Sequence, residues 1–203
     1  AYGSYLKTYK ALKNKYFKNE LCQTTLKDEV RAATTLTKLS QLKPVFKTKG
    51  SVSAGNASSL NDGAAFLALA SSEYIKANKI KPLAKVLSWS SSAGNPDYMG
   101  ITPITAIQKL MKKMSVNISF FDLVEINEAF AATSVAVQRS LQIDPNKLNI
   151  VGGAIALGHP IGCSGTRIVT TLAHQLKRTK KKFGVASMCI GGGQGLAMAI
   201  EKL

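Results

Sequence analysis

The sequence predicts an α/β fold in which helices pack on a largely buried sheet. From Asn61 onward, stretches with the apolar periodicity of helices alternate with short apolar stretches typical of strands. Apolar residues make up 45% of the 203-residue chain, which is enough to bury a core of ordinary size. No apolar run approaches the ~18 residues of a membrane-spanning helix, so we expect no membrane partner.

The elements expected within 61–203 follow one another with short connections. Helices are expected over 64–77, 103–114, 128–141 and 164–177. Strands are expected over 84–91, 120–126, 148–151, 183–189 and 196–201. Because strands and helices alternate along the chain, we expect one sheet with helices packed against it.

Residues 1–60 lack a self-sufficient pattern of elements. A lysine-rich helix is expected over 1–20, a second helix over 28–42 and an extended basic strand over 46–53. Pro44 ends the second helix, because the residue before a proline avoids helical angles. We interpret this segment as the end of an excursion from a larger domain, followed by a domain at 61–203.

The charge of the chain is strongly positive, with a formal net charge of +16. Residues 1–60 hold eleven basic and three acidic residues, against sixteen and eight in the longer remainder. Lysines make up 23 of the 27 basic residues, and aromatic residues are not interleaved with them, so we do not expect a nucleic-acid partner. Two interpretations remain: a solvated surface rich in lysine, or a positive field that steers a polyanionic ligand.

The three cysteines have no paired spacing and form no CxxC motif. This usage indicates a reducing compartment, cytoplasmic or mitochondrial, and argues against structural zinc.

Two glycine-rich turns carry reactive side chains. One is the run Gly-His-Pro-Ile-Gly at 158–162, and the other is Cys-Ile-Gly-Gly-Gly at 189–193. Such turns let backbone amides and a side chain approach a ligand closely. A histidine beside a thiol can hold a proton, polarise a carbonyl or tune a thiolate. The alternative is that both runs are tight turns and Cys189 is a small buried hydrophobe.

Two further stretches occur upstream of these turns, namely VEINEAF at 124–130 and SAGNASSLNDGAA at 53–65. With the four motifs in this order, the chain resembles the thiolases, and within them the acetoacetyl-CoA (biosynthetic) type. The resemblance implies the C-terminal half of an αβαβα layered body at 61–203. Residues 1–60 would then be the C-terminal part of the loop domain that binds coenzyme A. It further implies coenzyme A thioesters as substrates, no cofactor, no metal, and a homodimer or homotetramer.

Thiolases join two acetyl-CoA molecules into acetoacetyl-CoA by a Claisen condensation, or run the reaction backwards. By resemblance, Cys189 is the base that removes the alpha proton, and the Gly191 amide stabilises the oxyanion of the acyl-enzyme. His159 activates the nucleophile and points a ring N–H at the second thioester oxygen, where Asn127 positions a water. Asn127 has an alternative role as the N-cap of the helix expected over 128–141.

The resemblance also assigns substrate-binding positions. Ser58 and Ala54 are expected to hydrogen-bond the pantetheine, Phe46 to line the coenzyme A groove, and Ala129 and Phe130 to lie near the acyl pocket.

Two other side chains receive structural interpretations. His174 is expected on the surface of its helix. Cys163 is expected to pack beneath the His159 turn.

The nucleophilic cysteine of thiolases lies in their N-terminal half, and no cysteine here matches it. Cys22 stands in a strand-like stretch without a glycine turn, so it is a poor substitute. We therefore expect the C-terminal half of a thiolase, inert alone, whose partner is the missing N-terminal half.

Two alternatives stay open: a degradative 3-ketoacyl-CoA thiolase, or a non-catalytic binding or assembly module. Ketoacyl synthases are disfavoured, because they use a second histidine where this chain has Cys189.

Overall fold

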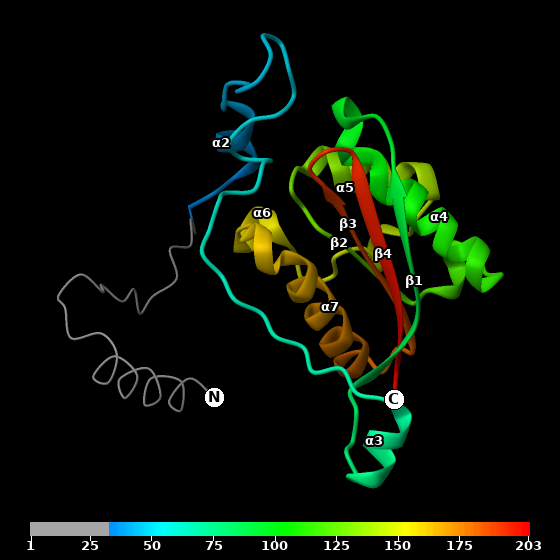
Figure 1. Cartoon of the computed structure of the whole chain (residues 1–203). Helices are drawn as coiled ribbons and strands as arrows, with labels where there is room; N and C mark the ends of the chain where they lie inside the picture. The colour runs from blue at the N-terminus through cyan, green and yellow to red at the C-terminus, as the bar shows by residue number, and fades with distance from the viewer. Residues whose placement is uncertain (1–32) are drawn as a thin grey trace. The chain divides into compact units, whose positions relative to one another are not determined.

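A four-stranded sheet forms the centre of the computed structural model, which describes residues 33–203 (Figure 1). The strand order is β1 (Ala84–Ala93), β4 (Gln194–Lys202), β3 (Phe183–Ile190) and β2 (Leu123–Ile126). β4 runs antiparallel to both β1 and β3, whereas β2 and β3 are parallel. The two parallel strands therefore end at the same edge of the sheet.

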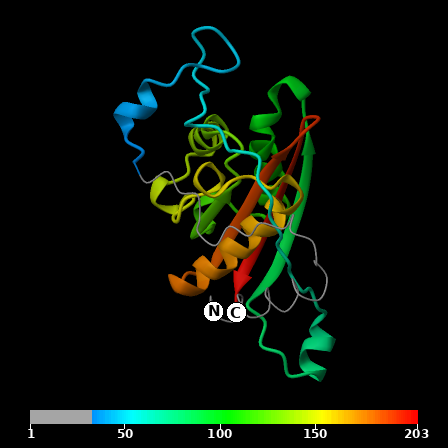
Figure 2. The ribbon, with the colours of Figure 1, turned by 90° about the vertical axis from the view of Figure 1, so that its left-hand side faces the viewer.

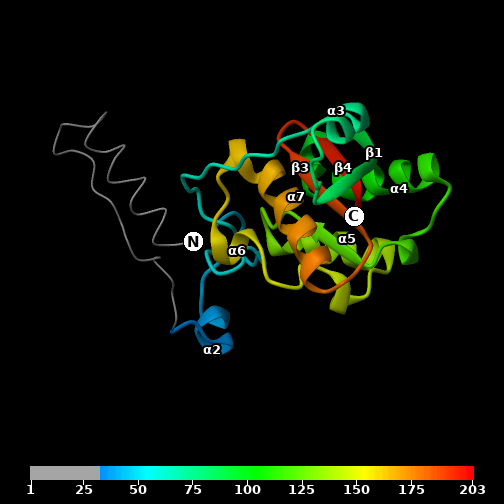
Figure 3. The same ribbon diagram turned by 90° about the horizontal axis from the view of Figure 1, so that it is seen from below.

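Helices cover both faces of this sheet. α4 (Thr102–Met114) and α5 (Ala131–Leu141) share one apolar cluster with Val124, Ile126 and Val185. α7 (Ile161–Arg178) packs on the opposite face, in a second cluster with Leu123, Ala186 and Ile200. Figure 2 shows α7 in front of the strands, and Figure 3 shows α7 and α4 on opposite sides of them. The layered α/β fold expected from the sequence is confirmed.

Burial on both faces explains why β2 and β3 read as apolar runs instead of alternating with polar residues. All four residues of β2 are buried, and their side chains point alternately to the two clusters. Glu125 is the exception among them, because it places a carboxyl group inside the α7 layer at 2% exposure.

Short elements connect the main ones. They are α2 (Leu36–Ser40), α3 (Ser72–Ala77), the 3-10 helices η1 (Pro96–Ile101), η2 (Ile118–Phe120) and η3 (Pro145–Lys147), and α6 (Ala154–Leu157). No helix among residues 33–203 is both long and apolar enough to cross a membrane.

The strands expected over 84–91, 183–189 and 196–201 and the helices expected over 103–114 and 164–177 are confirmed with small shifts of their ends. The helix expected over 1–20 lies outside the described residues, as does Cys22.

Three expectations near the start of the described chain were wrong. The helix expected over 64–77 is helical only from Ser72, because the Ser71 side chain caps its first turn by accepting from the Tyr74 amide. Residues 61–71 form no helix or strand and run past α6 and α7 toward α3 (Figure 1). The helix expected over 28–42 covers only Leu36–Ser40 among the described residues, because Thr35 caps it.

The strand expected over 46–53 is a turn. The Val45 amide donates to the Val52 carbonyl at 3.0 Å, and the Gly50 amide donates to the Lys47 carbonyl at 2.8 Å. These bonds close the chain on itself, and residues 46–53 pair with no strand in the described part of the chain.

Three boundaries around the sheet edge also differ from expectation. The strand expected over 148–151 is a single bridge between Leu148 and Val124, because Asn149 adopts a left-handed φ of 45°. The helix expected over 128–141 begins only at Ala131, so Asn127 is not its N-cap. The strand expected over 120–126 begins at Leu123, after the 3-10 turn Ile118–Phe120.

Two glycines in the turn between β3 and β4, Gly191 and Gly193, differ in the space around their Cα atoms. Gly193 has a φ of 85°, and an added Cβ would lie 2.5 Å from the Gly94 carbonyl oxygen. Gly193→Ala is therefore expected to destabilise the fold by about 1–3 kcal/mol. Gly191→Ala is the matched control, since a Cβ there meets nothing within 4 Å. Urea unfolding of both variants checks this, and equal losses would contradict it.

Candidate active site

Asn127 and Cys189 lie where the parallel strands β2 and β3 end. Asn127 directly follows β2, and its amide donates to the Ser187 carbonyl of β3 at 3.0 Å. Cys189 is the next-to-last residue of β3. Both are buried, with Asn127 at 0% exposure. Carboxyl ends of parallel strands are the usual place for ligand sites in α/β folds.

His159 reaches this edge on the turn between α6 and α7. The turn is held by a bridge between His159 and Leu60, in which the His159 amide donates to the Ser59 carbonyl at 3.0 Å. Gly158 has a φ of 96°, and a Cβ there would collide with the Asn61 side chain. Two of the four sequence motifs, SAGNASSLNDGAA and the Gly-His-Pro turn, thus pack against each other.

Both ring nitrogens of His159 have partners. Nε2 lies 3.3 Å from Asn127 Nδ2, and Nδ1 lies 2.6 Å from Ser164 Oγ. Ser164 is fully buried in the first turn of α7. Burial, and then the positive charge of Arg167, lower the pKa of His159. The imidazole is therefore held neutral near pH 7 and available as a base.

Arg167 lies behind the Asn127 amide. Its Nη1 donates to Glu125 Oε1 at 3.2 Å, and its Nη2 donates to Asn127 Oδ1 at 3.3 Å. Burial raises the pKa of Glu125 to about 7, against the opposing effect of the Arg167 charge. The ion pair thus connects the buried carboxyl of β2 to the site.

The Cys189 thiol is kept in its neutral form. Burial raises its pKa, while hydrogen bonds from its own backbone amide and from the Thr133 hydroxyl act in the opposite direction. A neutral thiol can donate a proton, and its thiolate can accept one. Gly191 follows in the turn after β3, exposed and with open space on its Cα.

The expected substrate-binding residues are partly brought together. The Ser58 hydroxyl donates to the Ala129 carbonyl at 2.9 Å, and the rings of Phe46 and Phe130 meet edge to face at 6.1 Å. Ala54 lies exposed in the turn before Gly55. The segments that carry these residues are joined by a bridge between Ala57 and Phe130.

Two expectations about other side chains are confirmed. His174 is exposed on α7. Cys163 is half-buried beside the His159 turn, where its Sγ would lie 3.2 Å from a Cβ added at Gly63.

Asn149 supports the site and was not found from the sequence, whereas Glu128 was expected to have a supporting role at most. The Asn149 side chain makes the two hydrogen bonds that the backbone of a neighbouring strand would make to Ile126. Its Oδ1 accepts from the Ile126 amide at 2.8 Å, and its Nδ2 donates to the Ile126 carbonyl at 2.9 Å. Glu128 accepts from Asn149 Nδ2 at 2.9 Å and from the Ile155 amide at 3.2 Å, which fixes the chain that leads into the His159 turn. One signal for Arg167 was available in the sequence. Glu125 is an ionisable residue inside the apolar strand Leu123–Ile126, and such a residue demands a buried partner.

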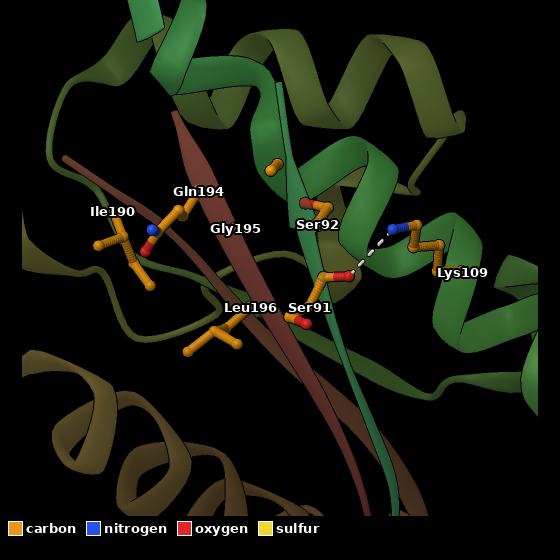
Figure 4. A pocket seen from close by; sticks show the side chains of 8 residues that line it. Ser91, Ser92, Lys109, Ile190, Gln194, Gly195 and Leu196 are labelled. Carbon is orange, nitrogen blue, oxygen red and sulfur yellow. Dashed lines mark hydrogen bonds between the residues drawn. The ribbon is translucent and has the colours of Figure 1, made fainter. Parts of the chain in front are cut away.

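A hollow lies beside this group of side chains and not on it. It measures about 460 Å³ and is lined by Lys109, Ile190 and Gln194 together with residues of β1 and β4 (Figure 4). Lys109 reaches from α4 and donates to the Ser91 carbonyl at 3.3 Å. Lys109 is the one ionisable side chain among the residues that line this hollow, and His159, Cys189 and Glu125 lie outside it.

An imidazole base, a buried thiol and an amide at one sheet edge define a site suited to proton and acyl transfer. The family model for the thiolase C-terminal domain matches residues 80–202, and that for the thiolase N-terminal domain matches residues 1–73. The chain belongs to the thiolase family.

Individual relatives agree with this assignment. The chain is 48% identical over 180 residues to rat mitochondrial 3-ketoacyl-CoA thiolase, covering 88% of this chain and 45% of the relative. It is 50% identical over 173 residues to a probable acetyl-CoA acyltransferase of Staphylococcus epidermidis, covering 85% and 44%.

Solved structures show the same fold. The acetyl-CoA acetyltransferase of Bacillus anthracis superposes with a TM-score of 0.85 at 44% identity, over 96% of this chain and 52% of that one. Human mitochondrial 3-ketoacyl-CoA thiolase in complex with CoA superposes with a TM-score of 0.82 at 44% identity, over 89% and 46%. The chain thus spans about half the length of the relatives that it matches.

Proposed function

We propose that this chain supplies His159, Cys189, Asn127 and the Gly191 amide to the active site of an acyl-CoA thiolase. The observation that carries the proposal is that His159 Nε2 and Asn127 Nδ2 lie 3.3 Å apart at the sheet edge where Cys189 is the next-to-last residue of β3. A Claisen condensation needs a base for a weakly acidic alpha proton and donors for two developing oxyanions. The thiolate of Cys189 serves as the base, and His159, Asn127 and the Gly191 amide serve as donors.

We propose acetyl-CoA as the substrate, condensed reversibly to acetoacetyl-CoA and CoA without a cofactor. The similarity to an acetyl-CoA acetyltransferase structure over 96% of the chain supports this choice. Cleavage of longer 3-ketoacyl-CoA thioesters is the second candidate, favoured by the identity of 48% to the rat thiolase. Thiolysis rates on a series of 3-ketoacyl-CoA chain lengths separate the two, since a strict preference for the four-carbon substrate supports only the first.

We propose that coenzyme A binds along the surface formed by Phe46, Ala54, Ser58 and Phe130. Ser58 donates its hydroxyl proton to Ala129, so its oxygen keeps lone pairs that can accept from a pantetheine amide. Phe46 and Phe130 offer apolar ring surface, and Phe46 is 73% exposed.

We further propose that the nucleophilic cysteine comes from a second thiolase domain that covers the α7 side of this chain, within a homodimer or homotetramer. Several large apolar side chains of the described residues have no cover there. They are Leu60, Phe66, Leu69, Leu157 and Ile161, each more than 65% exposed. An apolar surface of this kind is typical of a docking face.

The chain by itself is expected to show no condensation of acetyl-CoA and no cleavage of acetoacetyl-CoA, because no cysteine in it matches the acyl-accepting position. The release of CoA is the measurement, and addition of a thiolase N-terminal domain that contains the nucleophile is the positive control. Turnover by the chain alone, with alkylation mapped to Cys22 or Cys163, would overturn this part of the proposal.

A further inference from the structure

A continuous row of hydrogen bonds runs through the site, from the buried carboxyl of Glu125 to the Pro160 carbonyl. Its members are Glu125, Arg167, Asn127, His159, Ser164 and Pro160. We propose that Ser164 and Arg167 are positioning residues that hold His159 in one neutral tautomer, with the proton on Nδ1 and the lone pair of Nε2 facing Asn127. The tautomer is inferred from these hydrogen bonds, and only its consequence for catalysis rests on the proposed function.

The proton on Nδ1 follows from the bonds of Ser164. A hydroxyl carries a single proton, and Ser164 Oγ donates it to the Pro160 carbonyl at 3.0 Å. At its 2.6 Å contact with His159 Nδ1, the serine oxygen must therefore accept. Nδ1 carries the proton, and in a neutral imidazole Nε2 is then bare.

The bonds of Arg167 and Asn127 independently require the same tautomer. A guanidinium group has donors and no acceptor, so the atom of Asn127 that faces Nη2 at 3.3 Å must be the amide oxygen. The amide nitrogen of Asn127 then faces His159 Nε2 and donates to it at 3.3 Å. This bond also requires a bare Nε2.

Glu125 keeps Arg167 in place for this task. Its Oε1 accepts from Arg167 Nη1 at 3.2 Å, and both side chains lie within the α7 layer, Glu125 at 2% exposure. A guanidinium fixed at two nitrogens cannot rotate away from Asn127. The carboxylate thus sets the orientation of an amide that it does not touch.

The tautomer of His159 decides which nitrogen takes the proton of the nucleophilic thiol. When a nucleophilic thiol is deprotonated, its S–H bond breaks, the electron pair stays on sulfur, and the proton forms an N–H bond at Nε2. The new Nε2–H then points at the N–H of the Asn127 amide, and two donors cannot hydrogen-bond to each other. The Asn127 oxygen stays bonded to Arg167, so the amide N–H loses the acceptor at Nε2 and is left for another acceptor, such as a water or a thioester oxygen. Protonation of His159 at Nε2 therefore also frees the Asn127 N–H to bind another acceptor.

Imidazole NMR tests the tautomer without any need for turnover. The chain has two histidines, and exposed His174 gives an internal reference. With ¹⁵N-labelled histidine, long-range ¹H–¹⁵N spectra above neutral pH are expected to show His159 protonated at Nδ1 alone. In Ser164→Ala we expect a second population with the proton on Nε2, because the acceptor of Nδ1–H is gone.

A matched control removes the same kind of bond elsewhere on α7. Thr170 Oγ1 donates to the Thr166 carbonyl at 2.8 Å, four residues earlier, as Ser164 does to Pro160. Thr170→Ala is expected to leave the His159 signals unchanged. The double variant Glu125→Gln/Arg167→Met frees the Asn127 amide to flip, so an Nε2–H population should appear there as well.

Two outcomes overturn the proposal: a wild-type His159 protonated at Nε2, or a folded Ser164→Ala variant with an unchanged tautomer. If the variants fail to fold, the wild-type spectrum decides alone. An Nδ1–H spectrum in a chain that stays inactive with its N-terminal domain would overturn the proposed function and leave the tautomer intact.

Discussion

Cys189→Ser is expected to slow condensation by about 10²–10⁴-fold, the range that a positioned general base contributes, while acylation of the nucleophilic cysteine continues. The physical reason is acidity. A serine hydroxyl keeps the geometry of the side chain, but it is a far weaker acid than a thiol and does not form the anion that removes the alpha proton. The base acts only after the first acyl group has been transferred, so the first half-reaction does not need it.

His159→Ala is the complementary variant and is expected to damage both half-reactions. The imidazole takes the proton of the nucleophile first, and the resulting Nε2–H then faces the thioester oxygen of the second substrate. The measurement uses this chain with the N-terminal domain that supplies the nucleophile. Acyl-enzyme formation is followed by mass spectrometry, and acetoacetyl-CoA by its absorbance. The roles are wrong if Cys189→Ser abolishes acylation while His159→Ala leaves it intact.

Acylation and condensation should depend differently on pH, because they use different bases, His159 and Cys189. Burial lowers the pKa of His159, so its neutral, base form is already populated at neutral pH and acylation should change little above it. Burial raises the pKa of the Cys189 thiol, so its thiolate grows only as the pH becomes alkaline. Condensation should therefore still rise with pH after acylation has levelled off.

The sequence predicted the sheet and its main helices because their signals are local. Apolar runs such as Phe183–Ile190 and the amphipathic residues of α7 carry their periodicity within a few turns. The segment 64–71 was mistaken for helix because alanine and leucine are good helix formers. Exposed Phe66 and Leu69 have no core to pack against, so propensity alone does not fold this segment.

The site was predictable only as far as motifs name single residues. His159, Asn127 and Cys189 were found because glycine turns and strand ends mark them. Ser164, Arg167 and Asn149 were not, because each acts through a hydrogen bond to a residue at least five positions away, and no periodicity records such a bond. The roles assigned to the three motif residues stay predictions until the variants above are measured.

Removing the guanidinium of Arg167 is expected to produce a large and pH-dependent loss of stability. Arg167→Met leaves the Glu125 carboxylate buried without a cation, which costs about 3–5 kcal/mol when the carboxyl is ionised. In the wild type the pKa of Glu125 is already raised to about 7, above its ordinary value of 4.5. Loss of the positive charge raises it further.

The sign follows from proton linkage. The folded protein binds the Glu125 proton more tightly than the unfolded chain does, so the stability from this group is fully present below pH 4.5 and is lost as the pH rises through about 7. The Arg167→Met loss should thus be near its maximum at pH 8 and fall to about 1–2 kcal/mol at pH 5, where the protonated carboxyl lacks only a hydrogen-bond partner.

Urea unfolding followed by the fluorescence of Trp89, the only tryptophan, measures this loss at both pH values. Arg178→Met is the control on the same helix. Its side chain is exposed and, among the described residues, bonds Gln175 at 2.7 Å, so a change within about 0.5 kcal/mol is expected. Glu125→Gln/Arg167→Met should recover much of the stability at pH 8, because the double variant buries no charge. A loss that is equal at both pH values, or a double variant no more stable than Arg167→Met, would show that the guanidinium acts through packing and not through its charge on Glu125.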